Sequence, residues 1–394
     1  MLESGDKMPK TNRTKKQHYI AQGIIREFFD SSKIYEKNLH NGKIYKSSID
    51  DTMCMSNSYE LPLFDDNFLE DLFAKSIDCD SSVLIIKLKK LLEEENYIDA
   101  KNMIFKNIRM FLINYYKSIT SLIHMSKEIS KKDNSSIVRM VNTIFNMPYI
   151  DRLSELLCTG YDFSIIKSND GNFVLSDQYI STCSLKFIGK FINMSNREIG
   201  LKNTIVLIPI SKDYYGIFIN GQFPNNFSIK TSSINELNEC QTQIINNIIF
   251  NNSYEKCISL NEKEMLNLER KNPSNGDLMA FAKFESGDSA AFKIKQEVFF
   301  DEEGYEMYKY FESYEWSNKK YKKCGVNSLC QCGSNRKYKK CCRNKVENCE
   351  RILNIMHYQK DNLFINKKLG CEEPVQLSNY EHSELQKKFE FLTK

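Results

Sequence analysis

No stretch of this 394-residue sequence reaches the roughly 18 uncharged apolar residues that a membrane-spanning helix needs. The apolar runs SVLIIKL and IRMFLINYY are short and interrupted by charge. Residues 1–16 also lack the apolar segment of a secretory signal peptide. These absences predict a cytoplasmic protein with no membrane partner.

The common signatures of nucleotide and hydrolase chemistry are absent as well. The sequence contains no P-loop, no G-x-G-x-x-G, no H-E-x-x-H and no G-x-S-x-G. Nucleotide-driven work and most familiar hydrolase mechanisms are therefore not expected.

Cysteine is present in an odd number, thirteen, which does not suit a framework of disulfides. Scattered cysteines such as Cys54, Cys158 and Cys240 are expected to be thiols in a reducing compartment. Four others lie close together near the C-terminus with a spacing typical of metal ligands: Cys330, Cys332, Cys341 and Cys342.

The spacing of these four residues predicts one structural zinc ion. Cys330-Gln331-Cys332 supplies two sulfurs from one tight turn, and Gly333 can adopt the positive φ that such a turn requires. The adjacent pair Cys341 and Cys342 supplies two more from the other end of a short loop. Four thiolates leave no open coordination position, so the metal would be structural rather than catalytic. The alternative is a chance cluster of cysteines.

The same segment is strongly basic. Between Lys319 and Lys345 there are ten Lys and Arg and no Asp or Glu, although the whole chain carries only +4. The residues expected to contact a nucleic acid or another partner are Arg336, Lys337, Lys339, Lys340 and Arg343. Tyr321 and Tyr338 lie among these cations and could stack on bases. The alternative is a solvated basic face that merely offsets the thiolates.

Hydrophobic periodicity divides the preceding chain into two parts. Apolar residues recur three and four apart over about 65–158, which predicts several helices. Short alternating segments over about 160–255 predict a mostly antiparallel sheet, including a hairpin around 161–180 and a helix over 233–250. An earlier hairpin is expected at His40-Asn41-Gly42, with a type I′ turn. The fold class is therefore α+β: a helical N-terminal half packed with a mostly antiparallel sheet, plus a small C-terminal zinc module.

The predicted organisation has five parts. They are a flexible basic tail (1–16), a main α+β domain (17–300), a linker (301–323), the zinc module (324–345) and a C-terminal helix and tail (346–394).

The segment CQCGSNRKYKKCC resembles the SEC-C motif, which is found at the C-terminus of the SecA translocation ATPase and in many other bacterial proteins. The usual pattern is a Cys-Pro-Cys-Gly-Ser-Gly-Lys-Lys-Tyr-Lys run that ends in Cys-Cys or Cys-His. Gln331 replaces the usual Pro and Asn335 a usual Gly, and neither is a ligand. The resemblance implies a docking role on a chaperone or the ribosome.

A second resemblance covers roughly residues 15–258. The run HYIAQGIIREFF, with His18 and Gln22, is similar to the opening of the bacterial family catalogued as domain of unknown function 4238. Later matches are the strand end Leu175–Gln178, the strand segment Pro209–Ser211 and, in an Asn-containing helix, Asn235–Asn238. Departures are Ala21 for Pro, Gln178-Tyr179 for Asn-Pro, and the reduction of an Arg-Thr-Pro-like piece to Lys117-Ser118. The genomic setting of some members implies a role in anti-phage defence or abortive infection.

Two residues of these matched segments are candidates for catalysis. His18 could exchange protons near neutral pH, and Asp177 could orient it or activate a nucleophile such as Ser176. The alternative is structural: His18 and Gln22 would hydrogen-bond the entry of the first element to the sheet. The acidic residues Glu70, Asp71 and Asp78 are interpreted as a solvated helix face.

Two functions are compatible with these features. The first is a cytoplasmic stress or phage-defence effector, which the zinc module docks on RNA, DNA or the translation machinery. The second is a non-enzymatic adaptor that binds a chaperone or the ribosome through the same module. Whether the main domain is an enzyme depends on whether His18 and Asp177 meet in the fold.

Overall fold

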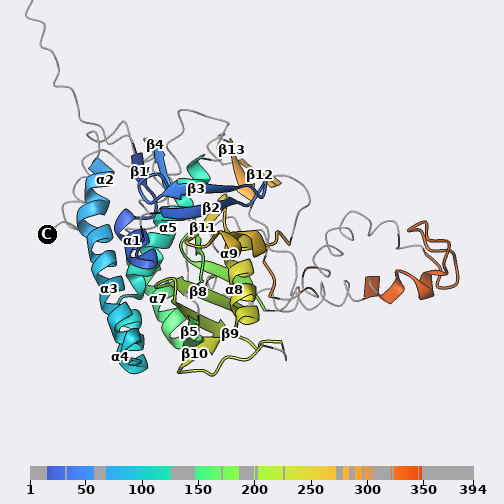
Figure 1. The fold of residues 1–394 in the computed structure, drawn as a ribbon. Coiled ribbons are helices and arrows are strands. Elements are labelled where there is room, and N and C mark those ends of the chain that lie inside the picture. Colours follow the sequence, from blue (N-terminus) through green and yellow to red (C-terminus); the bar gives the residue numbers. More distant parts are fainter. Residues whose placement is uncertain are drawn as a thin grey trace, which may run out of the picture.

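The fold was analysed in a computed structural model of the chain (Figure 1). The structure describes residues 16–56, 68–125, 147–185, 199, 203–271, 278–283, 289–294, 298–300, 302, 305, 321 and 324–347, except for 32, 170–171, 225–226 and 345. Most of the predicted basic tail, of the predicted linker and of the predicted C-terminal helix and tail lies outside these residues; Lys16 of the predicted tail belongs to a strand.

A five-stranded sheet forms the centre of the main domain. Its order is β10-β5-β9-β8-β7, and every pairing is antiparallel except that of β10 with β5. The strands are β5 (Asp162–Ser168), β7 (Ser181–Ser184), β8 (Thr204–Pro209), β9 (Tyr214–Asn220) and β10 (Ile234–Leu237). Every residue of β8 is buried, which explains its continuous apolar run TIVLIP.

A second sheet of four strands has the order β3-β2-β11-β6. It contains β2 (Lys33–Asn38), β3 (Ile44–Ser48), β6 (Leu175–Ser176) and β11 (Lys256–Ser259). Two smaller antiparallel pairs are β1 (Lys16–His18) with β4 (Cys54–Ser56), and β12 (Leu278–Lys283) with β13 (Ser289–Ile294).

The hairpin predicted around Asn41-Gly42 exists as β2–β3, but its turn is not of type I′. Such a turn needs two successive residues with positive φ, and only Gly42 has one, at 68°. The side chain of Asn38 accepts hydrogen bonds from the backbone amides of His40 and Asn41, at 2.9 and 3.0 Å. This side-chain cap stabilises a longer loop in place of the two-residue turn.

The second predicted hairpin is wrong. Strand β5 lies in the five-stranded sheet between β9 and β10, whereas β6 pairs with β11 in the other sheet. The helix predicted from residue 233 also begins later, because Ile234–Leu237 forms the parallel edge strand β10. Asn238 then caps α8 through a capping box with Gln241.

Helices flank the central sheet on two sides (Figure 1). The helices between the two early hairpin strands and β5 are α2 (Phe68–Phe73), the π-helix Ala74–Asp78, α3 (Cys79–Glu93), α4 (Tyr97–Lys106), α5 (Ile108–Met125) and α7 (Met147–Gly160). The others are α1 (Gln22–Phe29), α8 (Glu239–Asn252) and α9 (Glu262–Asn267). Helix α3 lies on one flank and α8 on the other.

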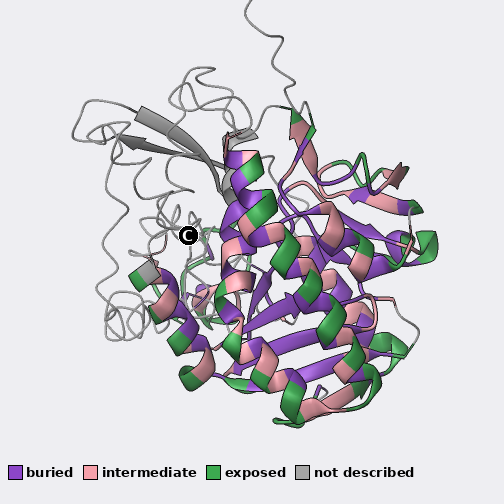
Figure 2. Cartoon of the chain, turned by 90° about the vertical axis from the view of Figure 1, so that its left-hand side faces the viewer, coloured by how far each residue is buried: buried purple, intermediate pink, exposed green. Residues whose placement is uncertain are grey.

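One hydrophobic core joins these elements. It extends from Tyr19 before α1 to Val298 after β13 and includes buried residues of both larger sheets. Figure 2 shows the buried residues filling the interior between helices and strands. The main domain is thus α+β, as predicted. No described helix is long and apolar enough to cross a membrane.

Candidate functional site

The four predicted metal ligands lie on a compact hairpin and turn in the C-terminal segment. Leu329 and Lys337 form an antiparallel bridge, and the Cys330 amide donates to the Arg336 carbonyl at 2.7 Å. Gly333 has a φ of 83°, as predicted, and Asn335 has a φ of 53°. Asn is among the few side-chain-bearing residues that tolerate this region, so it can replace the usual Gly of the SEC-C pattern.

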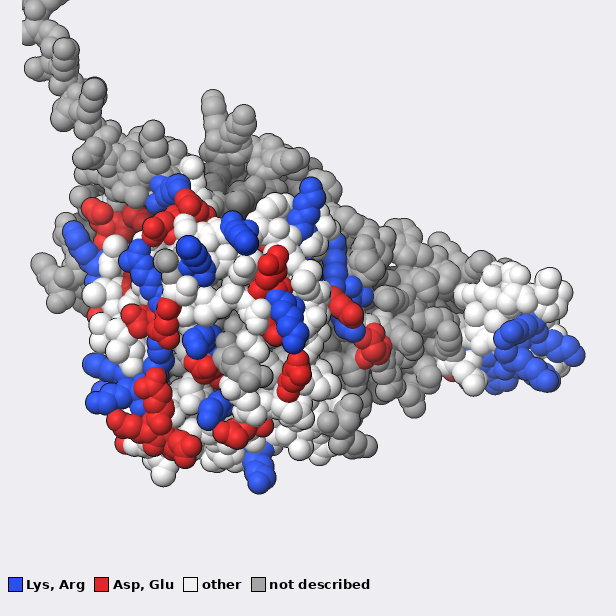
Figure 3. Space-filling model, in the orientation of Figure 1, with Lys and Arg blue, Asp and Glu red and all other residues white. Residues whose placement is uncertain are grey.

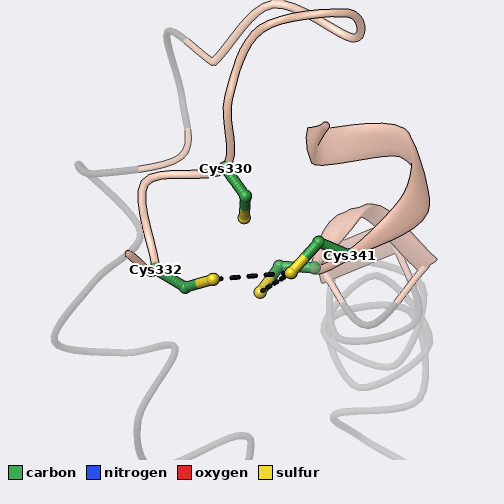
Figure 4. Close-up of side chains that lie close together, drawn as sticks. Cys330, Cys332 and Cys341 are labelled. Carbon is green, nitrogen blue, oxygen red and sulfur yellow. Dashed lines mark hydrogen bonds between the residues drawn. The ribbon is translucent and has the colours of Figure 1, made fainter. Parts of the chain in front are cut away.

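The four sulfurs converge on one point. All of them lie within 4.8 Å of one another (Figure 4). The sulfur of Cys341 is 3.4 Å from that of Cys332 and 3.8 Å from that of Cys342. In a tetrahedral site with zinc–sulfur bonds of about 2.3 Å, neighbouring sulfurs are about 3.8 Å apart. The geometry and the donor set therefore fit one metal ion.

Two hydroxyl groups contact these sulfurs. Ser334 Oγ lies 3.1 Å from the sulfurs of both Cys332 and Cys341. The hydroxyl of Tyr321 donates to the sulfur of Cys342 at 3.7 Å. The side-chain and backbone hydrogen bonds of Ser334 lower the pKa of Cys332 to about 6. Burial instead raises the pKa of Cys342 to about 12, and the hydrogen bond from Tyr321 opposes that rise. A hydrogen bond to sulfur favours the thiolate, which is the form that binds a metal.

Four of the described basic residues of this segment are exposed: Arg336, Lys337, Lys339 and Lys340. Figure 3 shows Lys and Arg gathered on the outer face of the module. Within the described part of the chain, no ion pair involves Arg336, Lys337, Lys339 or Lys340. Arg343 differs, since its Nε lies 2.6 Å from the Glu347 carboxylate. The free positive charge therefore comes from four of the five predicted contact residues.

The two tyrosines among these cations contact each other. Their rings stack with centroids 5.9 Å apart and an interplanar angle of 17°. Tyr338 is 8% exposed and belongs to the small core of the module. Tyr338 therefore offers no free face for a base, which corrects the sequence-based expectation.

Asp177 lies at the end of β6 and is fully buried. One carboxylate oxygen accepts from the Tyr254 amide at 2.9 Å, and the other accepts from the amides of Glu255 and Lys256 at 2.7 and 3.0 Å. Burial raises the pKa of Asp177, and the three amide bonds oppose that rise. The side chain thereby ties β6 to the chain between α8 and β11.

His18 lies at the end of β1, and no hydrogen bond joins it to Asp177 among the described residues. Its Nε2 is 3.2 Å from Nε2 of Gln22 at the start of α1, which is the contact that the structural alternative requires. Burial lowers the pKa of His18, a hydrogen bond with the Ile49 backbone opposes this, and the charge of Lys117 adds to the lowering.

Comparison with known families identifies the main domain. A family described as "Protein of unknown function (DUF4238)" matches residues 16–263, which is more than half of the chain. The chain belongs to the DUF4238 family. The match ends before the four cysteines, so SEC-C stays a resemblance. No curated protein and no solved structure matches the chain.

Within the DUF4238 region, helix α5 connects segments that are far apart in the sequence. Ser118 Oγ donates to the backbone carbonyl of Gln178 at 2.9 Å. The neighbouring Lys117 has a fully buried side chain, whose Nζ lies 2.8 Å from both oxygens of Asp78. Ser118 thus joins α5 to the segment Leu175–Gln178, and the charges of Lys117 and Asp78 act on the pKa of His18.

The Lys117–Asp78 ion pair was missed by the sequence analysis. Asp78 was interpreted as part of a solvated face, but its side chain is only 19% exposed and closes the π-helix Ala74–Asp78. Periodicity contained a usable signal, because Lys117 occurs within the apolar run of α5, beside buried Tyr115 and Tyr116. A lysine on a buried helix face requires an acidic partner.

Proposed function

We propose that the four-cysteine module binds one structural zinc ion and docks this DUF4238 protein on nucleic acid or on the RNA of the translation machinery. The DUF4238 region would then act as a stress or phage-defence effector. The observation that carries the proposal is the group of four unpaired cations on a module whose cysteines converge on one point. The defence role is what the resemblance to this family implies.

The identity of the metal is inferred from its ligands. Four thiolates in a tetrahedral arrangement favour zinc over hard cations, which prefer oxygen. Zinc held by Cys330, Cys332, Cys341 and Cys342 would keep both ends of the hairpin together. It would supply no catalysis, because no coordination position stays open.

The charge on the module favours a polyanionic partner. A zinc ion with four thiolates carries a net charge of about −2, which the cations of the module exceed. Arg336, Lys337, Lys339 and Lys340 are exposed. Phosphate groups release counterions when such residues bind them, and this drives association with nucleic acid.

The test is binding of the full-length protein to single-stranded RNA and to duplex DNA, measured by fluorescence anisotropy at several salt concentrations. The logarithm of the affinity should fall with the logarithm of the salt concentration, by roughly 0.7–0.9 per phosphate contact. The double change K339E/K340E should weaken binding while zinc stays bound. The matched control is K87E/K90E, which reverses two exposed lysines on α3. Equal loss in both variants, or no binding at low salt, would contradict the proposal.

A second function, that of a non-enzymatic adaptor, is favoured by a different feature of the module. Val326 and Leu329 are 44% and 64% exposed, beside the cations. Apolar side chains in such a position suit a chaperone or a ribosomal protein better than a phosphate backbone. Binding to purified bacterial ribosomes that is lost in L329S, but kept in K339E/K340E, would support the adaptor.

A further inference from the structure

One sulfur of the metal centre has a hydroxyl partner from outside the SEC-C-like segment. The hydroxyl of Tyr321 donates to the sulfur of Cys342 at 3.7 Å. The backbone of the same residue accepts a hydrogen bond of 2.9 Å from the Cys324 amide. Tyr321 is therefore joined to the module at both its side chain and its backbone.

The ring of Tyr321 is held as well. It stacks on Tyr338, with centroids 5.9 Å apart and planes at 17°. Tyr338 packs with Cys330 and Val346 in the core of the module. This stack fixes the direction of the phenol, so its hydroxyl points at Cys342 with little rotational freedom left to lose.

The four sulfurs differ in their hydroxyl partners. Ser334 contacts both Cys332 and Cys341, but its hydroxyl has one proton and can donate to one sulfur at a time. For Cys342, the hydroxyl donor is Tyr321. Donors of this kind compensate the excess negative charge of four thiolates around a divalent ion.

We propose that Tyr321 is a positioning residue of the metal centre, one that orients the sulfur of Cys342 through the hydrogen bond from its hydroxyl. This inference rests on the proposed zinc site. It extends the metal-dependent unit from Cys330 back to Tyr321. Metal binding would then also order the end of the segment that joins the module to the DUF4238 region.

The experiment uses full-length protein loaded with Co²⁺, whose thiolate charge-transfer bands report the sulfur ligands, and a competing chelator to measure the affinity. Y321F removes the hydroxyl and keeps the stacked ring. It should weaken metal binding about 10-fold or more, as loss of such partners does in other metal sites. It should also shift the charge-transfer bands. Y45F, which removes a hydroxyl from the exposed Tyr45 of β3, is the matched control and should change neither.

Three results separate the possibilities. If Y321F binds cobalt within about twofold of the wild type and has the same bands, the hydroxyl does not position Cys342 and the inference is overturned. If Y321L is impaired while Y321F is not, only the stack matters, which also overturns it. If the wild-type protein takes up no metal, the zinc proposal itself fails, and this is visible without any variant.

Discussion

The DUF4238 region and the four-cysteine module differ in the amount of apolar surface that stabilises their folds. The first belongs to one apolar core, which begins at Tyr19 and continues beyond the matched residues to Val298. Among the described residues, the second has a core of three buried side chains, Cys330, Tyr338 and Val346. A segment with so little apolar surface cannot offset its conformational entropy by burial alone. We therefore expect the module to depend on a metal for its fold and the larger region not to.

The two regions also differ in whether their charged side chains have partners. In the DUF4238 region two buried charged side chains have partners: Lys117 pairs with Asp78, and Asp177 accepts from three backbone amides. The module leaves Arg336, Lys337, Lys339 and Lys340 exposed and without ion pairs among the described residues. Satisfied buried groups specify a fold, whereas unpaired surface charges are available to a partner.

The largest expected effect comes from removing a metal ligand. C341S should abolish stoichiometric zinc binding and unfold the module, because metal binding supplies about 10–16 kcal/mol in small zinc modules of this size. The thermal transition of the DUF4238 region should stay where it is. Elemental analysis measures the metal, and limited proteolysis with calorimetry follows the two regions separately.

C240S is the matched control, since Cys240 is an exposed thiol in the first turn of α8. It should keep both the metal and the protease resistance of the module. If C341S also lowers the thermal transition of the DUF4238 region, the two regions are not stabilised independently.

The sequence predicted the parts of the structure that depend on local patterns. The spacing of the four cysteines and the conformation of Gly333 need only a short loop, so they could be derived without the rest of the fold. The helices between residues 68 and 160 follow from apolar periodicity.

Contacts between residues that are far apart in the sequence could not be predicted from local patterns. Strand β6 follows β5 in sequence, yet it pairs with β11 because Asp177 is bonded to the chain around Glu255. The partner of Lys117 likewise lies 39 residues away, on another helix. The apolar run around Lys117 shows that it needs an acidic partner, but no local pattern identifies Asp78 as that partner or the Glu255 segment as the partner of Asp177. For this reason Asp177 was assigned a possible catalytic role and Asp78 a solvated position.

A smaller effect is expected from D177N, which keeps the shape of the side chain but replaces an acceptor by a donor. In one orientation of the new side chain, its NH2 group faces the Tyr254 N–H. In the other, its NH2 group faces the N–H groups of Glu255 and Lys256. At least one buried amide then loses its acceptor, which should lower the free energy of unfolding by about 1–3 kcal/mol. Urea unfolding measures this change.

The control is D213N, because Asp213 lies at the surface beside Lys212 and should change stability by less than about 0.5 kcal/mol. If D177N is as stable as the wild type, Asp177 does not hold β6 to β11, and its catalytic role would become the better explanation of its place in the motif.

The smallest effect concerns His18 and appears only as a dependence on pH. Burial lowers the pKa of His18 in the folded protein below its ordinary value of 6.5. Between these two values the unfolded chain binds more protons than the folded one, so the free energy of unfolding falls as the pH drops through this window. Above the ordinary value the ring is neutral in both states and the effect vanishes.

H18Q keeps a polar group beside Gln22 but cannot be protonated, so the stability of the wild type relative to H18Q should decline as the pH is lowered from neutral. Denaturant unfolding of both proteins at several pH values measures the difference. A relative stability that instead rises toward acid pH would mean that the nearby carboxylates of Asp50 and Asp78 outweigh burial. His18 would then be charged near neutral pH and unsuited to act there as a proton acceptor.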